Sequence, residues 1–256
     1  MTHFDESQVT KAIITAYHEK LLSHVVADVV VVGAGPSGLV AAADLAGRGL
    51  KVTLLEKRLT TGGGIWGGAM AMNEVVVQDE GLQLIEDFGI SCRSVSGGLH
   101  TANAIELASG LSLAAVRAGV ALFNLTFAED LCVHRDRVVG VVANRTGVAE
   151  SLPLDPVTFT AKAVLDATGH EAALVQMLRK RNLVEGAAAE GIEGPMCAAL
   201  GETIVVDAVR EVFQGLWASG MCIVATLGGP RMGPIFGGML LSGRRAADLI
   251  SQALSV

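Results

Sequence analysis

The sequence predicts an α/β fold of the Rossmann-like type with an inserted β-rich layer, on three observations. Residues 28–58 run as an apolar strand, a glycine-rich turn, a helix and a second strand. From about 74 to 160 the pattern changes to short helices and β-rich stretches. A long helical segment then closes the chain at 233–254. We therefore expect a single domain over residues 1–256, with the β-rich region inserted at about 74–160.

The first elements each carry a local signal. Apolar side chains at four-residue spacing predict an amphipathic helix over 6–22, with Asp5 or Ser7 as its cap. The run DVVVV at 28–32 predicts a buried strand. Segment 37–49 predicts a helix that ends at a glycine. Together these elements begin a β-turn-α-β unit.

Later elements alternate between helix and strand. Residues 81–90 predict a helix, and 121–144 predict two strands joined by the polar turn HRDR, which indicates a hairpin. Residues 156–169 predict a β-rich stretch, and 216–225 another buried strand. The segment AAAEGIEGP at 187–195 predicts a mobile loop.

Composition and charge exclude several function classes. Acidic residues outnumber basic ones by 26 to 19, and the net charge of −7 disfavours binding to nucleic acid or to an anionic membrane. No apolar stretch is predicted to span a membrane, and the polar start lacks the basic region of a signal peptide. The cysteines form no CxxC pair, which favours reduced thiols and a cytoplasmic protein: Cys92, Cys132, Cys197 and Cys222.

The turn at 33–38, Gly-Ala-Gly-Pro-Ser-Gly, predicts a dinucleotide site. It is a G-x-G-x-x-G directly after a strand and before a helix, and Glu56 follows 18 residues after Gly38. The glycines permit a tight turn and close approach of a pyrophosphate to the helix N-terminus. Glu56 would accept both ribose hydroxyls and repel a 2′-phosphate. These features favour NAD or FAD over NADP.

A late Ala-Thr-Gly strand end at 167–169, followed by a C-terminal glycine-helix segment, resembles the FAD-binding disulfide-reductase-like flavoproteins. Those proteins usually carry Gly-Asp after the last strand, and the Asp binds the flavin ribityl chain. Here Gly220 is followed by Met221. This departure disfavours FAD.

Four groups of residues resemble the eukaryotic and archaeal thiazole synthases of thiamine biosynthesis. They are VVGAGPSGL, LLEKR followed by GGGIWGG, LDP followed by DATGH, and GGPRMGPIFGGMLLSG. The resemblance covers residues 8 to 252, and the archaeal members are the most similar. It implies that NAD is a substrate: nicotinamide is lost, the ADP-ribose opens and isomerises, glycine condenses with it, and sulfur enters. The product would be an adenylated thiazole carboxylate.

The resemblance also implies an iron site. Its Asp and His ligands match Asp155 and His170, contributed by adjacent protomers of a homo-octamer. One carboxylate and one imidazole suit Fe(II) and leave positions open for substrate and sulfide. Without the resemblance, an Asp before Pro is usually a turn former and a His after a strand a satisfied polar residue. The metal prediction therefore depends on the family.

Further site residues follow from the glycine motif and the resemblance together. Arg231 matches the arginine that binds the glycine carboxylate, and a guanidinium offers a bidentate fork for it. Glu171 is a candidate acid/base group. The catalytic set is thus Asp155, His170 and Arg231. The positions expected around the NAD-derived ligand are Gly33, Gly35, Ser37, Gly38, Glu56, Lys57, Gly64, Ala128, Pro153, Leu154, Asp155 and Met221.

One position departs from the family pattern. Two residues before the metal Asp, eukaryotic members have a cysteine that donates its own sulfur, and archaeal members commonly have His and use free sulfide. This chain has Pro153, and none of its cysteines aligns with the donor. The resemblance therefore implies a sulfide-using enzyme that turns over many times.

Three alternatives remain open from the sequence. The first is an FAD-dependent oxidoreductase of the same architecture, which would need neither Asp155 nor His170. The second is a paralogue that binds an ADP-ribose derivative or acts like a ribose 1,5-bisphosphate isomerase. The third, a non-catalytic dinucleotide-binding module, leaves Arg231 unexplained.

Overall fold

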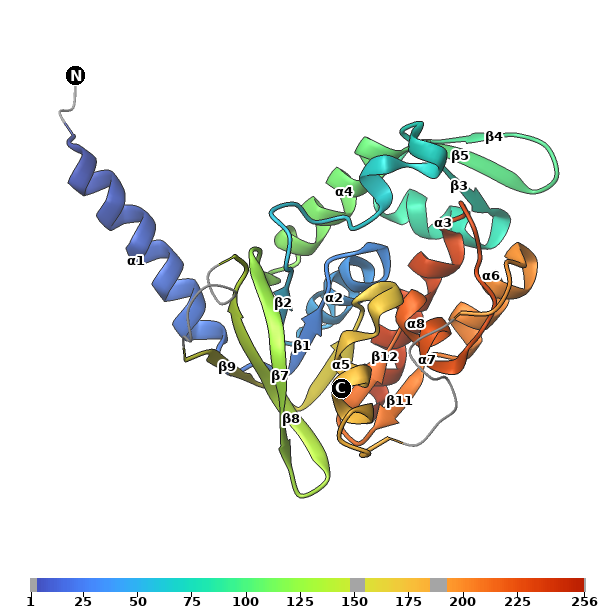
Figure 1. Ribbon diagram of the computed structural model, residues 1–256. Helices are drawn as coiled ribbons and strands as arrows, with labels where there is room; N and C mark the ends of the chain where they lie inside the picture. The colour runs from blue at the N-terminus through green and yellow to red at the C-terminus, as the bar shows by residue number, and fades with distance from the viewer. Residues whose placement is uncertain (1–3, 148–154, 185–192, 256) are drawn as a thin grey trace.

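The fold is built on a six-stranded sheet with the order β11-β12-β10-β1-β2-β6 (Figure 1). The computed structural model describes residues 4–147, 155–184 and 193–255. All neighbours in this sheet are parallel except β11 and β12. The parallel order confirms the predicted α/β fold. The strands are β1 (Val29–Val32), β2 (Val52–Leu55), β6 (Ala121–Phe123), β10 (Ala163–Asp166), β11 (Arg210–Phe213) and β12 (Leu216–Ala218).

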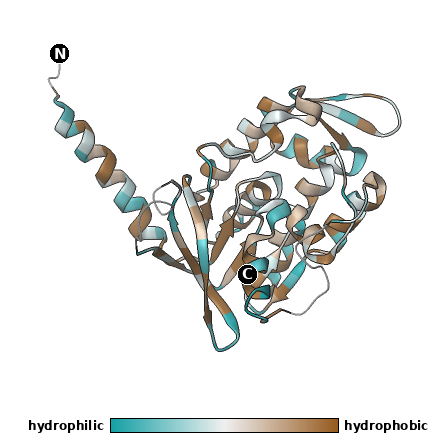
Figure 2. Cartoon of the chain, in the orientation of Figure 1, coloured by the Kyte–Doolittle hydropathy of each residue, from teal (hydrophilic) through white to brown (hydrophobic). Residues whose placement is uncertain are grey.

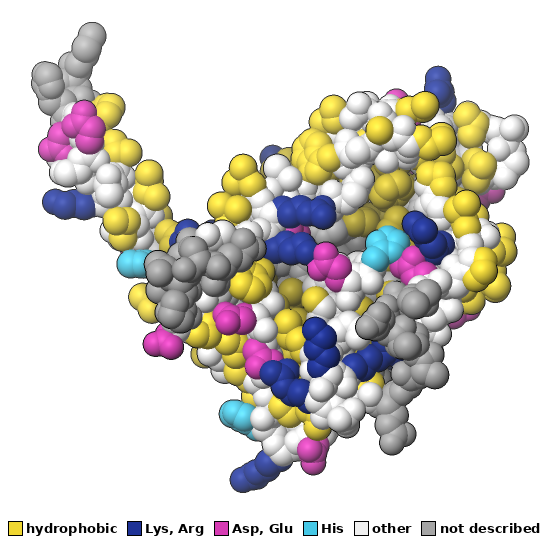
Figure 3. Space-filling view, viewed as in Figure 1, with side chains coloured by type: hydrophobic (Ala, Val, Ile, Leu, Met, Phe, Trp, Pro, Cys, Tyr) yellow, Lys and Arg dark blue, Asp and Glu magenta, His cyan; other side chains and the backbone are white. Residues whose placement is uncertain are grey.

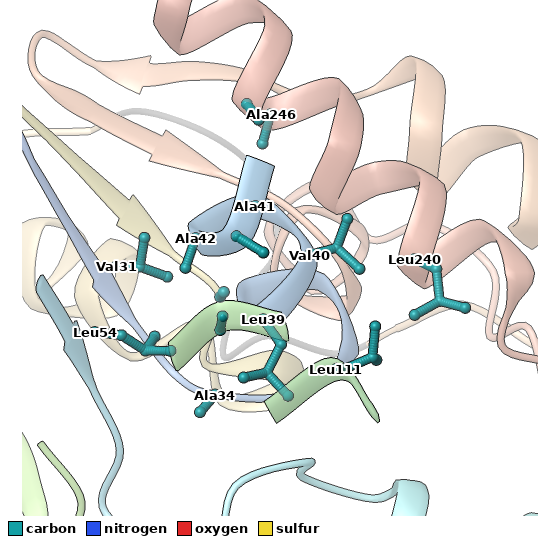
Figure 4. Close-up of a cluster of buried hydrophobic side chains, with 14 of the residues drawn as sticks. Val31, Ala34, Leu39, Val40, Ala41, Ala42, Leu54, Leu111, Leu240 and Ala246 are labelled. Atoms are coloured by element: carbon teal, nitrogen blue, oxygen red, sulfur yellow. The ribbon is translucent and has the colours of Figure 1, made fainter. Parts of the chain in front are cut away.

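Both faces of this sheet are covered, which explains the continuous apolar strands. Along β1, Val29 and Val31 face one hydrophobic cluster, and Val30 and Val32 face the other. The first cluster lies under α2 (Pro36–Gly47), α4 (Ala104–Arg117) and α8 (Gly237–Ala253). Because successive side chains of a strand point to opposite faces, a strand buried on both sides has no polar alternation. Figure 4 shows part of the first cluster, including Val31, Leu39, Val40, Leu54, Leu111 and Leu240.

The second face is covered by a three-stranded antiparallel sheet and two short helices. The sheet has the order β7-β8-β9, and the hairpin predicted at the HRDR turn is confirmed in its β7–β8 pair. The prediction of only two strands over 121–144 is wrong at its start, because residues 121–123 form the separate strand β6 of the main sheet. The turn residues Arg135 and Asp136 have φ of 49° and 61°, the left-handed values that a tight hairpin turn requires. The elements are β7 (Thr126–His134), β8 (Arg137–Arg145), β9 (Val157–Thr160), α5 (Ala173–Arg179) and α7 (Met221–Leu227).

A third small sheet, with the order β3-β5-β4, lies beside α3 and α4. The described part of the range 74–160 thus supplies two separate small sheets, two helices and one strand, β6, of the main sheet. The remaining elements are β3 (Glu74–Gln78), α3 (Asp79–Asp87), β4 (Cys92–Ser94), β5 (Leu99–Asn103), α6 (Ala198–Asp207) and the 3-10 turns Ile65–Gly67, Ala69–Ala71 and Gly169–Glu171.

The prediction of one strand over 216–225 is wrong in its second half. The strand β12 ends at Ala218, and α7 begins at Met221. Gly220 lies between them with φ of 65°, and its amide donates to the Ser242 hydroxyl of α8 at 2.7 Å. A left-handed residue cannot continue a strand, so the chain turns there into a helix. The apolar run at 216–225 was predicted to be one strand because a short buried helix and a buried strand are equally hydrophobic.

The N-terminal helix α1 (Glu6–His24) projects from the body of the protein (Figure 1), and none of its residues is buried. Asp5 caps it through a capping box with Gln8. Only its C-terminal half contacts the body: the ring of Tyr17 meets Phe123 edge-on at 5.8 Å. Figure 2 shows hydrophobic residues along the projecting helix as well as within the body. Among the helices that the structure describes, none has the length and apolar character needed to cross a membrane.

Candidate active site

A cavity of about 610 Å³ lies at the carboxyl ends of the parallel strands. This is the edge at which α/β sheets bind ligands. Figure 3 shows this face hollowed, with basic, acidic and histidine side chains around the hollow. Ten of the predicted site residues line the cavity: Gly33, Gly35, Ser37, Glu56, Lys57, Gly64, Ala128, His170, Met221 and Arg231.

The glycines of the 33–38 turn are required by close backbone packing. Gly33 has φ of 102°, and a Cβ there would lie 2.4 Å from the Ala167 carbonyl oxygen. A Cβ at Gly38 would lie 1.9 Å from the Gly33 carbonyl oxygen. Gly38 does not line the cavity. It allows α2 to pack directly behind the turn, which is the role of the third glycine in such motifs.

The N-terminus of α2 lies at the cavity, and no side chain among the described residues caps it. Gly35 is its N-cap, makes no side-chain capping bond, and is followed by Pro36, which has no amide hydrogen. The first amides of a helix have no partner within the helix, so a ligand anion would accept from them. Ser37 also lines the cavity, and its hydroxyl lies 2.7 Å from that of Ser219. The arrangement would hold a pyrophosphate.

Glu56 follows the last residue of β2 and is almost fully buried. One carboxylate oxygen accepts from the Ala34 amide and the other from the Arg58 amide, each at 2.8 Å. A carboxylate oxygen has two lone pairs, so each oxygen keeps one for a further donor. Two adjacent ribose hydroxyls would be such donors. A 2′-phosphate would meet a fixed negative charge instead.

The turn that carries His170 is fixed by the buried carboxylate of Asp166. One oxygen accepts from the Thr168 amide at 3.0 Å and hydroxyl at 2.7 Å, and the other from the amides of Leu174 and Val175. Burial raises the pKa of this carboxyl above its ordinary value, although these hydrogen bonds act in the opposite direction. The network joins β10 to the start of α5 and holds the intervening 169–171 turn at the cavity. The backbone that carries His170 is therefore held in place by the hydrogen bonds of Asp166.

A second carboxylate, Glu193, joins His170 to Arg231. The Glu193 Oε1 atom pairs with His170 Nδ1, and its Oε2 atom lies 3.3 Å from Arg231 Nε. The Glu193 side chain is 8% exposed, whereas those of His170 and Arg231 are 61% and 63% exposed. Two predicted catalytic side chains, His170 and Arg231, thus both pair with Glu193. Glu193 was not predicted from the sequence to be a site residue.

Lys57 and Glu171 form an ion pair at the wall of the cavity. The Lys57 Nζ atom lies 2.7 Å from both carboxylate oxygens of Glu171. The two side chains are 45% and 60% exposed. In this ion pair the positive charge of Lys57 balances the negative charge of Glu171. A ligand that bound Lys57 would break the pair and leave the Glu171 carboxylate available for proton transfer.

Asp155 does not line the cavity of its own chain. It is exposed and lies two residues before β9. Pro153 and Leu154, which were predicted to border the ligand, lie outside the described residues. Among the residues that the structure describes, no group of three or more His, Cys, Asp or Glu side chains is placed to hold a metal ion. A metal ligand set of three or more such side chains is therefore not found within one chain in this part of the protein.

The donor chemistry of His170 nevertheless fits Fe(II). Nδ1 of this exposed, cavity-lining imidazole is engaged by Glu193. Among the described residues no hydrogen bond is found to the other ring nitrogen, Nε2, which could supply its lone pair to a metal. Metal-bound histidines commonly have this arrangement, with a carboxylate on the second nitrogen. His170 would supply one ligand, and the exposed carboxylate of Asp155 from another copy would supply the second.

Neither Glu193 nor Asp166 was predicted from the sequence, for different reasons. Glu193 lies in the segment 187–195 that was predicted to be a mobile loop, of which residues 187–192 lie outside the described residues. No local pattern distinguishes it from a solvated acidic residue. Asp166 had a usable signal: a lone carboxylate ends an otherwise apolar strand, directly before an Ala-Thr-Gly turn and a helix.

The cysteines that the structure describes lie off the cavity. Cys222 is fully buried, and burial raises the pKa of its thiol well above the ordinary value. Burial also raises the pKa of Cys92 and Cys132. These three thiols are therefore poor nucleophiles near neutral pH.

A family model, curated relatives and a solved structure all match this chain over most of its length and belong to one family. The model of the Thi4 family matches residues 10–236. A thiamine thiazole synthase of Thermococcus kodakarensis is 49% identical over 250 residues, covering 97% of this chain and 98% of the relative. One from Methanothermobacter thermautotrophicus is 42% identical and covers 98% of both chains. The crystal structure of THI4 from Thermovibrio ammonificans superimposes with a TM-score of 0.95 at 42% identity, covering 100% of both chains.

Proposed function

The chain belongs to the Thi4 family, and on that premise we propose that it is a thiamine thiazole synthase. Its substrates are NAD, glycine and sulfide, and its products are an adenylated thiazole carboxylate and nicotinamide. One observation carries the proposal: a single cavity combines a dinucleotide motif with His170 and Arg231. A simple nucleotide-binding module would need only the first of these.

The nucleotide half of the cavity binds the ADP-ribose portion. The free amides at the start of α2 hold the pyrophosphate, and Glu56 accepts from the ribose hydroxyls. Met221 and Ala128 line the cavity beside them. Lys57 neutralises charge on the ligand, and its release of Glu171 provides an acid or base next to the sugar.

The reaction half binds the second substrate and the metal. Arg231 binds the glycine carboxylate through its guanidinium fork. His170 and the Asp155 of an adjacent protomer hold Fe(II), which would supply a Lewis acid and open coordination positions. The exposure of Asp155 and its absence from its own chain's cavity support sharing of the site within an oligomer, which the family resemblance implies to be an octamer.

The sulfur comes from free sulfide, and the enzyme turns over repeatedly. Pro153 stands at the position of the family's donor cysteine. The four cysteines are unpaired, which fits the reducing cytoplasm in which we place the protein. Nothing in the described cavity wall offers a thiol as an alternative donor.

The test is an anaerobic reaction of the purified protein with NAD, glycine, Fe(II) and sulfide, followed by mass spectrometry of products and protein. We expect adenylated thiazole in molar excess over protein, with the protein mass unchanged. Product limited to one equivalent, with loss of H₂S from the protein mass, would refute the sulfide-dependent mode. A yellow protein that leaves NAD untouched would replace the proposal with an FAD-dependent oxidoreductase. If the protein isomerised a ribose phosphate without using NAD, the proposal would be replaced by the alternative of a ribose 1,5-bisphosphate isomerase-like paralogue.

A further inference from the structure

The acidic side chain between His170 and Arg231 is buried in an unusual setting. Glu193 is 8% exposed, although both of its partners are more than half exposed. A carboxylate withdrawn from water is costly unless it accepts hydrogen bonds or faces a positive charge. Here it does both, because one oxygen faces an imidazole and the other a guanidinium. Its burial is thus explained by these two partners.

The backbone around Glu193 is tied to the loop that carries Arg231. The Gly194 amide donates to the Gly229 carbonyl at 2.8 Å, and Gly194 forms an isolated β-bridge with Pro230. The Cys197 amide donates to the Arg231 carbonyl at 2.9 Å. The carboxylate is therefore anchored at a fixed place relative to Arg231 instead of reaching it from a free loop.

The hydrogen-bond chemistry assigns a distinct function to each oxygen. Arg231 Nε forms an ion pair with the facing oxygen at 3.3 Å, and its two terminal nitrogens remain to donate to another carboxylate. If His170 Nδ1 donates to the other oxygen, Nε2 carries the lone pair that a metal requires. One acidic side chain thus fixes the tautomer of the imidazole and the direction of the guanidinium.

We propose that Glu193 is a positioning residue that couples the metal ligand His170 to the glycine-binding residue Arg231. The inference rests on the proposed function, because it assigns these roles to its two partners. Glu193 itself touches neither substrate nor metal. Its carboxylate sets the separation and orientation of two groups that must act on one glycine molecule. Metal affinity and glycine affinity therefore depend on the same side chain.

The variant Glu193→Gln tests whether the Glu193 carboxylate positions His170 and Arg231 or only fills space between them. Glutamine has the same shape but only one acceptor oxygen, and its amide nitrogen would face a donor. We expect Fe(II) affinity to fall about 10- to 100-fold, the range observed when such supporting partners are removed. The KM for glycine should rise about tenfold, and the affinity for NAD should stay unchanged. Glu193→Asp keeps both acceptor oxygens on a shorter side chain and should recover part of the loss.

The experiment compares wild type, the two Glu193 variants and Glu74→Gln, in which the same change is made on an exposed residue of β3. Anaerobic equilibrium dialysis measures Fe(II) affinity, calorimetry measures NAD affinity, and initial rates give KM for glycine. If wild type binds neither Fe(II) nor glycine, the proposed function fails. If wild type binds both and Glu193→Gln matches it, only the coupling role fails. Equal losses in the Asp and Gln variants, accompanied by loss of NAD binding, would assign Glu193 to general folding and overturn the inference.

Discussion

The two halves of the cavity are built on different principles. The nucleotide half consists of strand ends, a glycine turn and the first turn of α2, and its groups are held by backbone hydrogen bonds and by burial. The reaction half consists of side chains on short turns, and His170 and Arg231 are both more than 60% exposed. The nucleotide half is formed by groups of a single chain. The reaction half exposes the side chains of His170 and Arg231 to solvent.

This difference separates binding from chemistry. A site made of backbone amides and buried carboxylates needs only a correct fold, so it forms whenever the sheet forms. A site made of exposed side chains depends on the contacts of those side chains, here the pairing of His170 and Arg231 with Glu193. The proposed function adds an adjacent copy and the bound substrates to these contacts. Substitutions should therefore divide into two classes, those that affect the fold together with nucleotide binding and those that affect catalysis alone.

The largest effect is expected for His170→Ala. Thiazole formation should fall at least about 10³-fold, because loss of the proposed metal ligand would remove several kcal/mol of Lewis-acid stabilisation. NAD affinity, measured by calorimetry, should be unchanged. Loss of NAD binding as well would show that the two halves are not separable.

Asp155→Ala should be equally inactive, and mixing it with His170→Ala sharpens the comparison. If adjacent chains share each site, co-expressed oligomers of the two variants contain sites with both ligands intact, about a quarter of the total in a random mixture. We expect activity to reappear in co-purified mixed oligomers. Continued inactivity of verified mixed oligomers would place both ligands in one chain.

Gly33→Ala should break the nucleotide half. Its positive φ and the 2.4 Å approach to the Ala167 carbonyl predict a loss of about 2 to 4 kcal/mol in the free energy of unfolding. The control is Gly35→Ala, because a Cβ there meets nothing within 4 Å and its φ is −78°. Urea unfolding of both variants checks the prediction, and equal stability of the two would contradict it.

Glu56→Gln should weaken NAD binding by about tenfold or more, since hydrogen bonds to a charged acceptor each contribute about 1.5 to 3 kcal/mol. It should also narrow the preference for NAD over NADP, because the fixed negative charge is gone. Titration with both nucleotides by calorimetry gives the two affinities. An unchanged ratio would mean that Glu56 does not face the ribose.

The smallest effect is expected for the ion pair of Lys57 and Glu171. Both side chains are about half exposed, so a double-mutant cycle with Lys57→Met and Glu171→Gln should give a coupling of less than about 1 kcal/mol in unfolding free energy. A larger value would show that the cavity wall is less solvated than its exposure indicates.

The sequence predicts the nucleotide half better than the reaction half, for a physical reason. The 33–38 turn and Glu56 owe their positions to strand and helix periodicity, which is local and can be recognised in one chain. Glu193 owes its position to a bridge between Gly194 and Pro230, which no local pattern encodes. Met221 lines the cavity although its helix was predicted to be a strand, because its assignment to the site came from the family resemblance and not from the secondary-structure pattern.

The central position of β1 has a consequence for synthesis of the chain. Its two neighbours are β2, made immediately afterwards, and β10, made only at Ala163–Asp166. Until then the valines of β1 present an open, flat, apolar edge of the kind that pairs with other chains. The hydrogen bond between Ser37 and Ser219 spans 182 positions, so the nucleotide cavity cannot close before the chain is nearly complete. Because the main sheet and the cavity both depend on contacts between residues far apart in the sequence, we expect the C-terminal third of the chain to be needed before β1 is fully paired and the cavity is closed.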